Sequence, residues 1–155
     1  MSWLNLTQLA TNATSSSIYS QCSPDRAVDA DPVDYLNNDC QACFSTACGQ
    51  AGDQWWEISL GATYDVKLIR VTPSIGCNSR LNGFGVYIDG NACASNIQIR
   101  DYGPPDYGCG HASDPYENAA APHLEILCNH TGSVLRIVRP GGSGACHTLK
   151  LCEVQ

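Results

Sequence analysis

Two groups of polar residues have the types and spacing to do chemistry. The first is the acidic stretch AVDADPVDYLNNDC, which places Asp29, Asp31, Asp34 and Asp39 within eleven residues. Carboxylate oxygens at this density suit calcium, a hard cation with flexible coordination. The stretch lacks the central glycine and the closing glutamate of an EF-hand. The sequence therefore leaves two interpretations open, an irregular calcium site and a solvated acidic loop.

The closing segment TLKLCEV adds another carboxylate. If this segment is a strand, Leu149, Leu151 and Glu153 share one face, because side chains alternate along a strand. A charged carboxylate on the side of two leucines would be costly to bury without a compensating charge. We therefore expect Glu153 to contribute to the same cation site as the aspartates.

The second group lies in TPSIGCNSRLNGF, from Thr72 to Phe84, where Arg80 is the one basic residue between two hydrophobic runs. Arg80 either contacts a ligand or holds its own loop by pairing with a carboxylate or capping carbonyl groups. Both interpretations remain open. Cys77 and Asn78 in the same loop, and Phe44 as an aromatic contact, complete the candidate ligand site with Arg80.

The cysteine content indicates an oxidising, extracellular route. Ten cysteines occur in 155 residues, which predicts up to five disulfides in a secreted protein. The alternative of a zinc site is weak, because Cys40 to Cys43 is the only C-x-x-C pair and no second pair completes four ligands. Sequons at Asn5, Asn12 and Asn129 add the expectation of a glycoprotein.

Charge and motifs exclude several classes of function. Fifteen acidic residues against eight basic ones give a net charge of −7, which disfavours nucleic acid as a partner. No apolar run approaches the length of a membrane span. The histidines lie in no recognisable catalytic signature, so we expect no enzyme. These histidines are His111, His123, His130 and His147.

The elements that must position these residues are strands. Short runs rich in β-branched and aromatic residues recur between turn signals, which is typical of an all-β sandwich or barrel in a single domain over residues 1–155. In WWEISL, Trp56, Ile58 and Leu60 share one face, so Trp56 is expected in the core. The predicted strands are residues 55–60, 66–72, 84–88, 96–100, 123–128, 134–139 and 148–154.

Taken together, these features resemble the F-type lectins, the fucolectin branch of the discoidin or coagulation-factor C-type domains. The resemblance implies an eight-stranded jelly-roll β-sandwich that is rich in disulfides and that binds carbohydrate with calcium. It covers nearly the whole chain in family order. The matching segments are NLTQLATNATSSS, AVDAD, Cys40, WWEISLGATYDVKLIRVT, CNSRLNGFGVYI, the pair Cys109 and Cys128, and LKLCEV.

The resemblance also implies a calcium site and two disulfides. Side chains of Asp29 and Glu153 would bind calcium together with further oxygens, several of them from the main chain. The disulfides implied are Cys40–Cys152, beside the calcium site, and Cys109–Cys128; the other six cysteines would form three more in a pairing that the sequence does not give. The further calcium oxygens would come from Arg26, Asp31, Asp39 and Cys152.

The sequence departs from the family at the sugar. Of the residues that clasp fucose in the family, only the last basic residue is kept, as Arg80. Loss of polar partners removes much of a site's discrimination between ligands. We therefore expect a glycan or glycoprotein ligand other than simple terminal fucose; the alternative is a discoidin-type adhesion module that binds a protein or another non-sugar ligand. The replaced positions fall at or near Ala42, Pro73 and Ile75.

Overall fold

The computed structural model describes residues 2–30, 43–73, 82–98, 123–141 and 148–155. In this part of the chain antiparallel strands dominate, which confirms the all-β class. Neither described helix is long and apolar enough to cross a bilayer. The elements are the 3₁₀ helices η1 (Leu6–Asn12) and η2 (Pro24–Val28) and the strands β1 (Ala13–Ser15), β2 (Phe44–Ser45), β3 (Gln54–Pro73), β4 (Phe84–Ile88), β5 (Asn91–Ile97), β6 (Leu124–Arg139) and β7 (Lys150–Val154).

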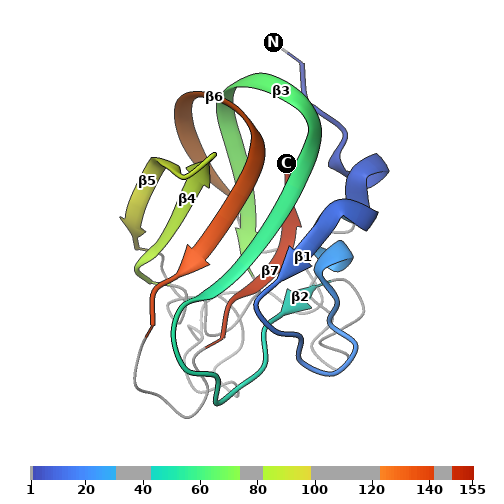
Figure 1. Cartoon of the computed structure of the whole chain (residues 1–155), viewed down its shortest axis with the longest axis vertical. Helices are drawn as coiled ribbons and strands as arrows, with labels where there is room; N and C mark the ends of the chain where they lie inside the picture. Colours follow the sequence, from blue (N-terminus) through green and yellow to red (C-terminus); the bar gives the residue numbers. More distant parts are fainter. Residues whose placement is uncertain (1, 31–42, 74–81, 99–122, 142–147) are drawn as a thin grey trace, which may run out of the picture.

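The two long strands, β3 and β6, build both layers of the molecule. They pair with each other along most of their length, with a register shift between Ser59 and Tyr64. On one side of this shift β3 also pairs with β1, and β6 pairs with β4, which pairs with β5; these strands form the first layer. On the other side β3 pairs with β7, which pairs with β2, in the second layer. Figure 1 shows the β3–β6 ribbon arching from one layer to the other, as a jelly-roll sandwich requires.

Each long strand unites two strands predicted separately. The predictions at 55–60 and 66–72 both lie in β3, and those at 123–128 and 134–139 both lie in β6, apart from the first residue, His123. Gly61 has a φ of 78°, which favours glycine, so β3 bends there while it remains in the sheet. The turn-forming residues between the predicted strands therefore mark a bend rather than a break.

The β4–β5 hairpin turns at Asp89 and Gly90, whose φ angles are 47° and 81°. An Asp-Gly pair with positive φ at both residues is typical of a two-residue hairpin turn. β4 matches the predicted strand at 84–88, but β5 starts directly after the turn, at Asn91, earlier than the predicted strand at 96–100.

The core lies between the layers and follows the predicted alternation. Trp56, Ile58 and Leu60 are buried, whereas Ser59 between them is exposed. Trp56 donates a hydrogen bond from Nε1 to the carbonyl oxygen of Pro24 at 2.9 Å, so the one polar atom of its side chain is satisfied. The predicted core role of Trp56 is confirmed.

The predicted Cys40–Cys152 disulfide is wrong, because Cys152 is bonded to Cys43, with a Cα–Cα distance of 4.0 Å. The cause is strand register. Phe44 of β2 lies opposite Leu151 of β7, so the residues next to them, Cys43 and Cys152, also face each other. The bridge still ties the segment before β2 to the final strand, as the resemblance implied.

The predicted Cys109–Cys128 disulfide is also wrong, because Cys128 of β6 is bonded to Cys93 of β5. The β4–β5 hairpin places β5 in contact with β6, which brings the two sulfurs together. Cys22 and Cys48 are disulfide-bonded too, and none of the described cysteines is a free thiol. The prediction of an oxidised protein is therefore confirmed for the six described cysteines; Cys40 and Cys109 lie outside the described residues.

Candidate functional site

The carboxylate of Glu153 is buried, with an exposed fraction of 6%. Glu153 lies in β7 opposite Thr72 of β3. Leu149 and Leu151 are fully buried, and so are Cys152 and Val154, so the end of β7 is buried on both faces. Because a charged carboxylate loses favourable hydration when it is buried, this position calls for compensation by a positive charge or by hydrogen bonds.

The acidic stretch AVDADPVDYLNNDC begins within η2, which packs against β7. Ala27 and Val28 are fully buried and anchor η2 in the core, while Arg26 and Asp29 are half-buried. Asp29 is the C-terminal cap of η2, and Ala30 after it has a φ of 64°, which turns the chain sharply. The start of the acidic stretch thus lies in and directly after an element that packs against the closing strand, β7.

The donors found here fit a calcium site in part. Calcium takes six to eight oxygen ligands, and Asp29 and Glu153 offer carboxylate oxygens. Cys152 can offer only its carbonyl oxygen, because its sulfur is in a disulfide. Within the described ranges no group of three or more His, Cys, Asp or Glu side chains gathers. Asp31 and Asp39, the other predicted ligands, lie outside them.

The candidate ligand residues Arg80, Cys77 and Asn78 also lie outside the described residues. The strand ends on either side of their loop are described. Pro73 at the end of β3 pairs with Leu151, in the second layer, and Phe84 at the start of β4 pairs with Ile97, in the first. In Figure 1 these strand ends lie at the lower end of the sandwich, opposite the β3–β6 arch. We call this lower end the loop end.

Two further sequence expectations can be placed. Phe44 is fully buried in the hydrophobic core, so its assignment to the ligand site is corrected to a packing role. Its ring faces inward because β2 is covered by the rest of the second layer and by η2. Pro73, where the family's first sugar-binding arginine is expected, is the last residue of β3 and is buried. It has no side-chain donor, which agrees with an altered sugar site.

One polar group was not anticipated from the sequence. On the outer face of the first layer, Arg136 donates a hydrogen bond from Nε to Glu57 Oε2 at 2.6 Å, and its guanidinium lies 4.5 Å from the ring centroid of Trp55. The alternation in WWEISL already predicts that Trp55 and Glu57 point outward. Their partner could not be predicted, because Arg136 is 79 residues from Glu57 and only the β3–β6 register brings them together.

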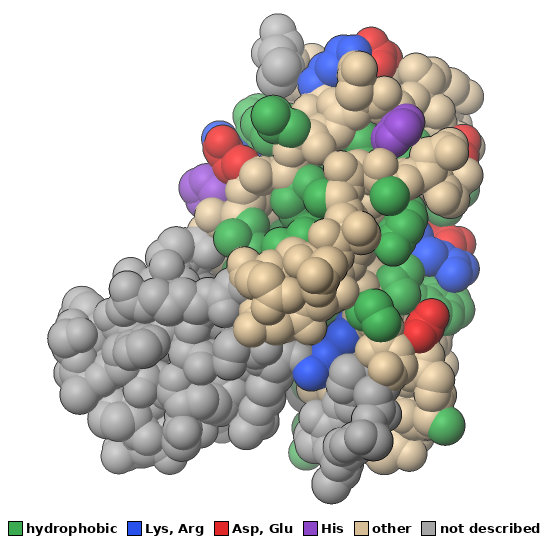
Figure 2. Space-filling model, turned by 90° about the vertical axis from the view of Figure 1, so that its left-hand side faces the viewer, with side chains coloured by type: hydrophobic (Ala, Val, Ile, Leu, Met, Phe, Trp, Pro, Cys, Tyr) green, Lys and Arg blue, Asp and Glu red, His purple; other side chains and the backbone are tan. Residues whose placement is uncertain are grey.

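Charges on the surface are mixed. Figure 2 shows one side of the molecule, where hydrophobic side chains gather in the middle and acidic and basic side chains lie in small neighbouring groups around them. No continuous basic field is seen among the described residues in this view.

The architecture is found in carbohydrate-binding proteins of known structure. A fucolectin from the serum of striped bass (Morone saxatilis) matches with a TM-score of 0.67 and 26% identity, over 94% of this chain and 45% of that chain. The chain has the F-type lectin fold. The resemblance inferred from the sequence is therefore confirmed at the level of the fold.

Two other carbohydrate-binding modules have a similar fold at lower sequence identity. The fucose-binding module SpX-3 of Streptococcus pneumoniae matches with a TM-score of 0.62 and 19% identity, over 92% of this chain and 89% of the module. The family 32 carbohydrate-binding module of C. perfringens NanJ, solved with galactose, matches with a TM-score of 0.61 and 14% identity, over 94% of this chain and 93% of that module. No protein-family model and no curated protein sequence matches the chain significantly. The chain spans less than half the length of the striped bass fucolectin.

Proposed function

We propose that the chain is a secreted, calcium-stabilised lectin-like module, not an enzyme, and that it binds a glycan other than simple terminal fucose at its loop end. The observation that carries this proposal is the F-type lectin fold, which covers 94% of the chain in the fucolectin match. The similar structures are a fucolectin, a fucose-binding module and a module solved with galactose. Sugar binding on this fold is thus the activity that their names share.

The calcium part of the proposal is supported by the buried position of Glu153 and by the packing of η2 against β7. Asp29 and Glu153 would supply side-chain oxygens, and Arg26 and Cys152 would supply main-chain oxygens. Asp31 and Asp39 are proposed as the remaining ligands. Bound calcium would neutralise the buried carboxylate of Glu153 and join the acidic stretch to the final strand, β7.

Secretion is supported by the oxidised cysteines and by the sequons. Disulfides are typical of oxidising compartments. The sequon residues Asn5, Asn12 and Asn129 are all exposed, so each is accessible to a glycosyltransferase. Asn5 also caps η1 by accepting a hydrogen bond from the amide of Thr7.

A glycan array tests the proposed function. The full chain is applied in calcium and, separately, in a chelator, and Arg80→Ala is compared with wild type. Lys67→Ala is the matched control, because it also removes one positive charge but lies on β3 beside Asp65, in an ion pair of 3.0 Å. We expect neutral glycans to bind in calcium, and binding to weaken in the chelator and in Arg80→Ala but not in Lys67→Ala.

A silent array would contradict glycan binding, provided that the protein is folded and saturated with calcium. Capture of a defined protein ligand under the same conditions would then favour the discoidin-type alternative. Strong binding to terminal fucose alone would contradict the altered sugar site. Equal weakening by Arg80→Ala and Lys67→Ala would mean that the effect is one of net charge and not of a contact at Arg80.

A further inference from the structure

The outer face of the first layer carries a row of side chains that the proposed function does not use. In β3, Trp56 and Ile58 face the core, so Trp55 and Glu57 project outward. The register places Arg136 of β6 directly between Glu57 of β3 and Tyr87 of β4. We call the four residues of this face, Trp55, Glu57, Arg136 and Tyr87, the outer platform.

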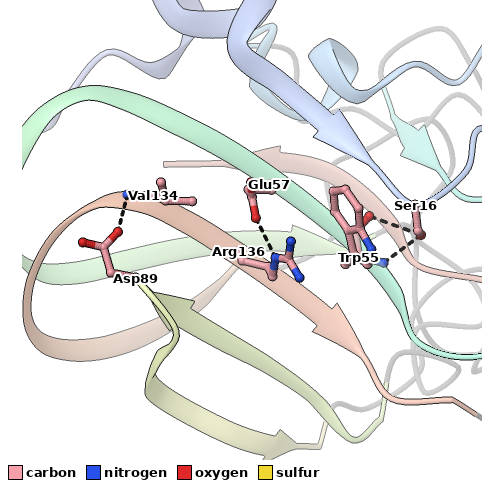
Figure 3. Close-up of polar contacts among 6 residues, drawn as sticks. All are labelled: Ser16, Trp55, Glu57, Asp89, Val134 and Arg136. Atoms are coloured by element: carbon pink, nitrogen blue, oxygen red, sulfur yellow. Dashed lines mark hydrogen bonds and ion pairs between the residues drawn. The ribbon is translucent and has the colours of Figure 1, made fainter.

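The arginine of the platform is held in a fixed orientation. Its Nε is bonded to Glu57 Oε2, and its guanidinium stacks over Trp55. Figure 3 shows Glu57 and Arg136 pointing toward each other across the two strands, with Trp55 next to them. Trp55 is fixed in turn, because its backbone amide donates to Ser16 Oγ at 2.9 Å and its carbonyl oxygen accepts from the amide of Ser16 at 3.0 Å. A site that is already ordered costs little conformational entropy on binding.

The ion pair keeps hydrogen-bonding capacity for a ligand. Among the described residues, the side chain of Arg136 makes one hydrogen bond, from Nε, whereas a guanidinium carries five N–H donors. The side chains of Arg136 and Glu57 are 43% and 29% exposed, so solvent reaches both. Donors of Arg136 therefore lie beside acceptor lone pairs of Glu57. Adjacent hydroxyl groups of a pyranose ring each donate and accept, which matches this arrangement.

The aromatic residues of the platform supply the apolar part. Trp55 and Tyr87 are half-buried and lie on β3 and β4, which flank β6 and are therefore about 10 Å apart, or two strand spacings. Val138, two residues after Arg136 in β6, lies opposite Trp55 of β3 on one side and Gly85 of β4 on the other. A Cβ at Gly85 would lie 2.7 Å from the Tyr87 hydroxyl, so glycine is required for the tyrosine to lie along its own strand. Flat aromatic surfaces of this kind pack against apolar C–H faces.

The charge of the platform selects among ligands. Arg136 and Glu57 neutralise each other, and the chain has a net charge of −7. An anionic ligand would meet repulsion from the whole protein and from Glu57, whereas a neutral ligand with hydroxyl groups would meet none. The chemistry thus favours a neutral saccharide.

We propose that the outer platform is a second saccharide-binding surface, which takes a neutral pyranose unit of a glycan independently of Arg80. The hydroxyl groups of the sugar bond to Arg136 and Glu57, and its C–H face packs on Trp55 or Tyr87. This inference rests on the proposed function for the class of ligand, but not for the place where the ligand binds.

An NMR titration of the isotope-labelled full chain tests the platform directly. Methyl β-D-galactopyranoside and methyl α-L-fucopyranoside are added to millimolar concentration, while the Trp55 Nε1–H and Arg136 Nε–H signals are followed; Trp55→Phe and Arg136→Lys assign these signals. We expect one sugar to shift both signals with a common saturation curve, and to do so equally in Arg80→Ala. Arg136→Gln should weaken this binding about tenfold, as loss of a hydrogen-bonding partner does.

The chain offers a matched control in Arg70→Gln. Arg70 is also bonded to a glutamate, Glu125, and also stacks on a tryptophan, Trp3, but it lies on the outer face of the second layer. Saccharide binding that survives Arg70→Gln and is lost in Arg136→Gln supports the platform. Shifts confined to signals other than those of Trp55 and Arg136 overturn the platform but leave the proposed function standing. Absence of any shift with either sugar overturns the platform, whereas the glycan array decides the proposed function. Platform shifts without a loss of array binding in Arg80→Ala overturn only the proposed role of Arg80.

Discussion

Two groups of one tryptophan, one arginine and one glutamate lie on the outer faces of the two layers. In the first layer Arg136 bridges Glu57 and Trp55, and in the second Arg70 bridges Glu125 and Trp3. Each arginine and its glutamate are directly opposite across β3 and β6, and each guanidinium lies within 4.5 Å of its ring centroid. The two groups therefore share their chemistry and their place in the strand pairing.

They differ in the backbone that carries the tryptophan. Trp55 belongs to β3, and its backbone is hydrogen-bonded to Ser16, so its group stands on backbone that the sheet holds in place. Trp3 lies in the segment before η1, is 47% exposed and borders an apolar cavity of about 140 Å³. Arg70 thus fastens the N-terminal segment to the sandwich, whereas Arg136 presents donors on a surface that is already formed. The same three residue types therefore attach the N-terminal segment in the second layer and form the outer platform in the first.

The layers are also held by different means. In the second layer the Cys43–Cys152 disulfide joins the residue before β2 to β7, and η2 packs against β7. In the first layer the Asp89 carboxylate accepts hydrogen bonds from the amides of Ser133 and Val134, and so fastens the β4–β5 hairpin to β6 (Figure 3). The Cys43–Cys152 disulfide thus lies within the layer that carries the proposed calcium site, whereas the layer that carries the platform relies on these hydrogen bonds together with the Cys93–Cys128 disulfide, which joins β5 to β6.

Removal of the Cys43–Cys152 disulfide should have the largest effect. The double substitution Cys43→Ser and Cys152→Ser opens a loop of 109 residues, which predicts a loss of about 4 kcal/mol in the free energy of unfolding. Urea unfolding monitored by tryptophan fluorescence measures it. A loss below about 1 kcal/mol would show that the second layer is held by its packing alone.

Calcium should stabilise the second layer by a somewhat smaller amount. A site that binds only the folded chain adds about 2.7 kcal/mol at a calcium concentration one hundred times its dissociation constant. Thermal unfolding in calcium and in a chelator checks this, with Glu153→Gln as the variant that should no longer respond. A melting temperature that is equal in both conditions would contradict the proposed calcium site.

The hydrogen-bonded brace of the first layer should contribute less than the disulfide. Asp89→Ala removes the acceptor for two backbone amides and should cost about 2 kcal/mol. Asp89→Asn keeps an acceptor oxygen and tolerates positive φ, so its loss should be clearly smaller. Equal losses for the two variants, measured by urea unfolding, would mean that the carboxylate does not hold the hairpin.

The smallest effects should separate the two tryptophan groups. Arg136→Gln and Arg70→Gln each remove a partly exposed ion pair, so each should cost about 1 kcal/mol or less. Their local effects should differ: Arg70→Gln should speed amide hydrogen exchange in η1, whereas Arg136→Gln should leave exchange in β3 unchanged. If hydrogen exchange rose to the same extent in η1 of Arg70→Gln and in β3 of Arg136→Gln, the proposed difference between the two tryptophan groups would be wrong.

Much of the fold could be predicted because side-chain alternation is a local property. The alternation of Trp56, Ile58 and Leu60 gave the buried face of β3. Glu153 is buried as expected, but because the end of β7 is covered on both faces, its burial does not depend on strand phase. Strand continuity was harder to predict. Gly61 is equally suited to a turn and to a bend, and only the continued pairing with β6 decides between them.

Pairings between distant residues could not be predicted from local pattern. Cys40 and Cys43 are three positions apart, and the β2–β7 register alone selects Cys43 as the partner of Cys152. Phe44 was assigned to ligand contact because its residue type suits both a core and a binding surface. The platform was missed for the same reason as the disulfides, since Glu57 and Arg136 meet only through register.

A binding isotherm tests the central claim, sugar binding on this F-type lectin fold, most directly. The wild-type chain is titrated calorimetrically, in calcium, with the strongest neutral glycan of the array and with the same glycan shortened by its terminal sugar. We predict a saturable isotherm for the intact glycan and a markedly weaker one for the shortened glycan. No saturable heat with either glycan up to millimolar concentration, from folded and calcium-saturated protein, would contradict the account.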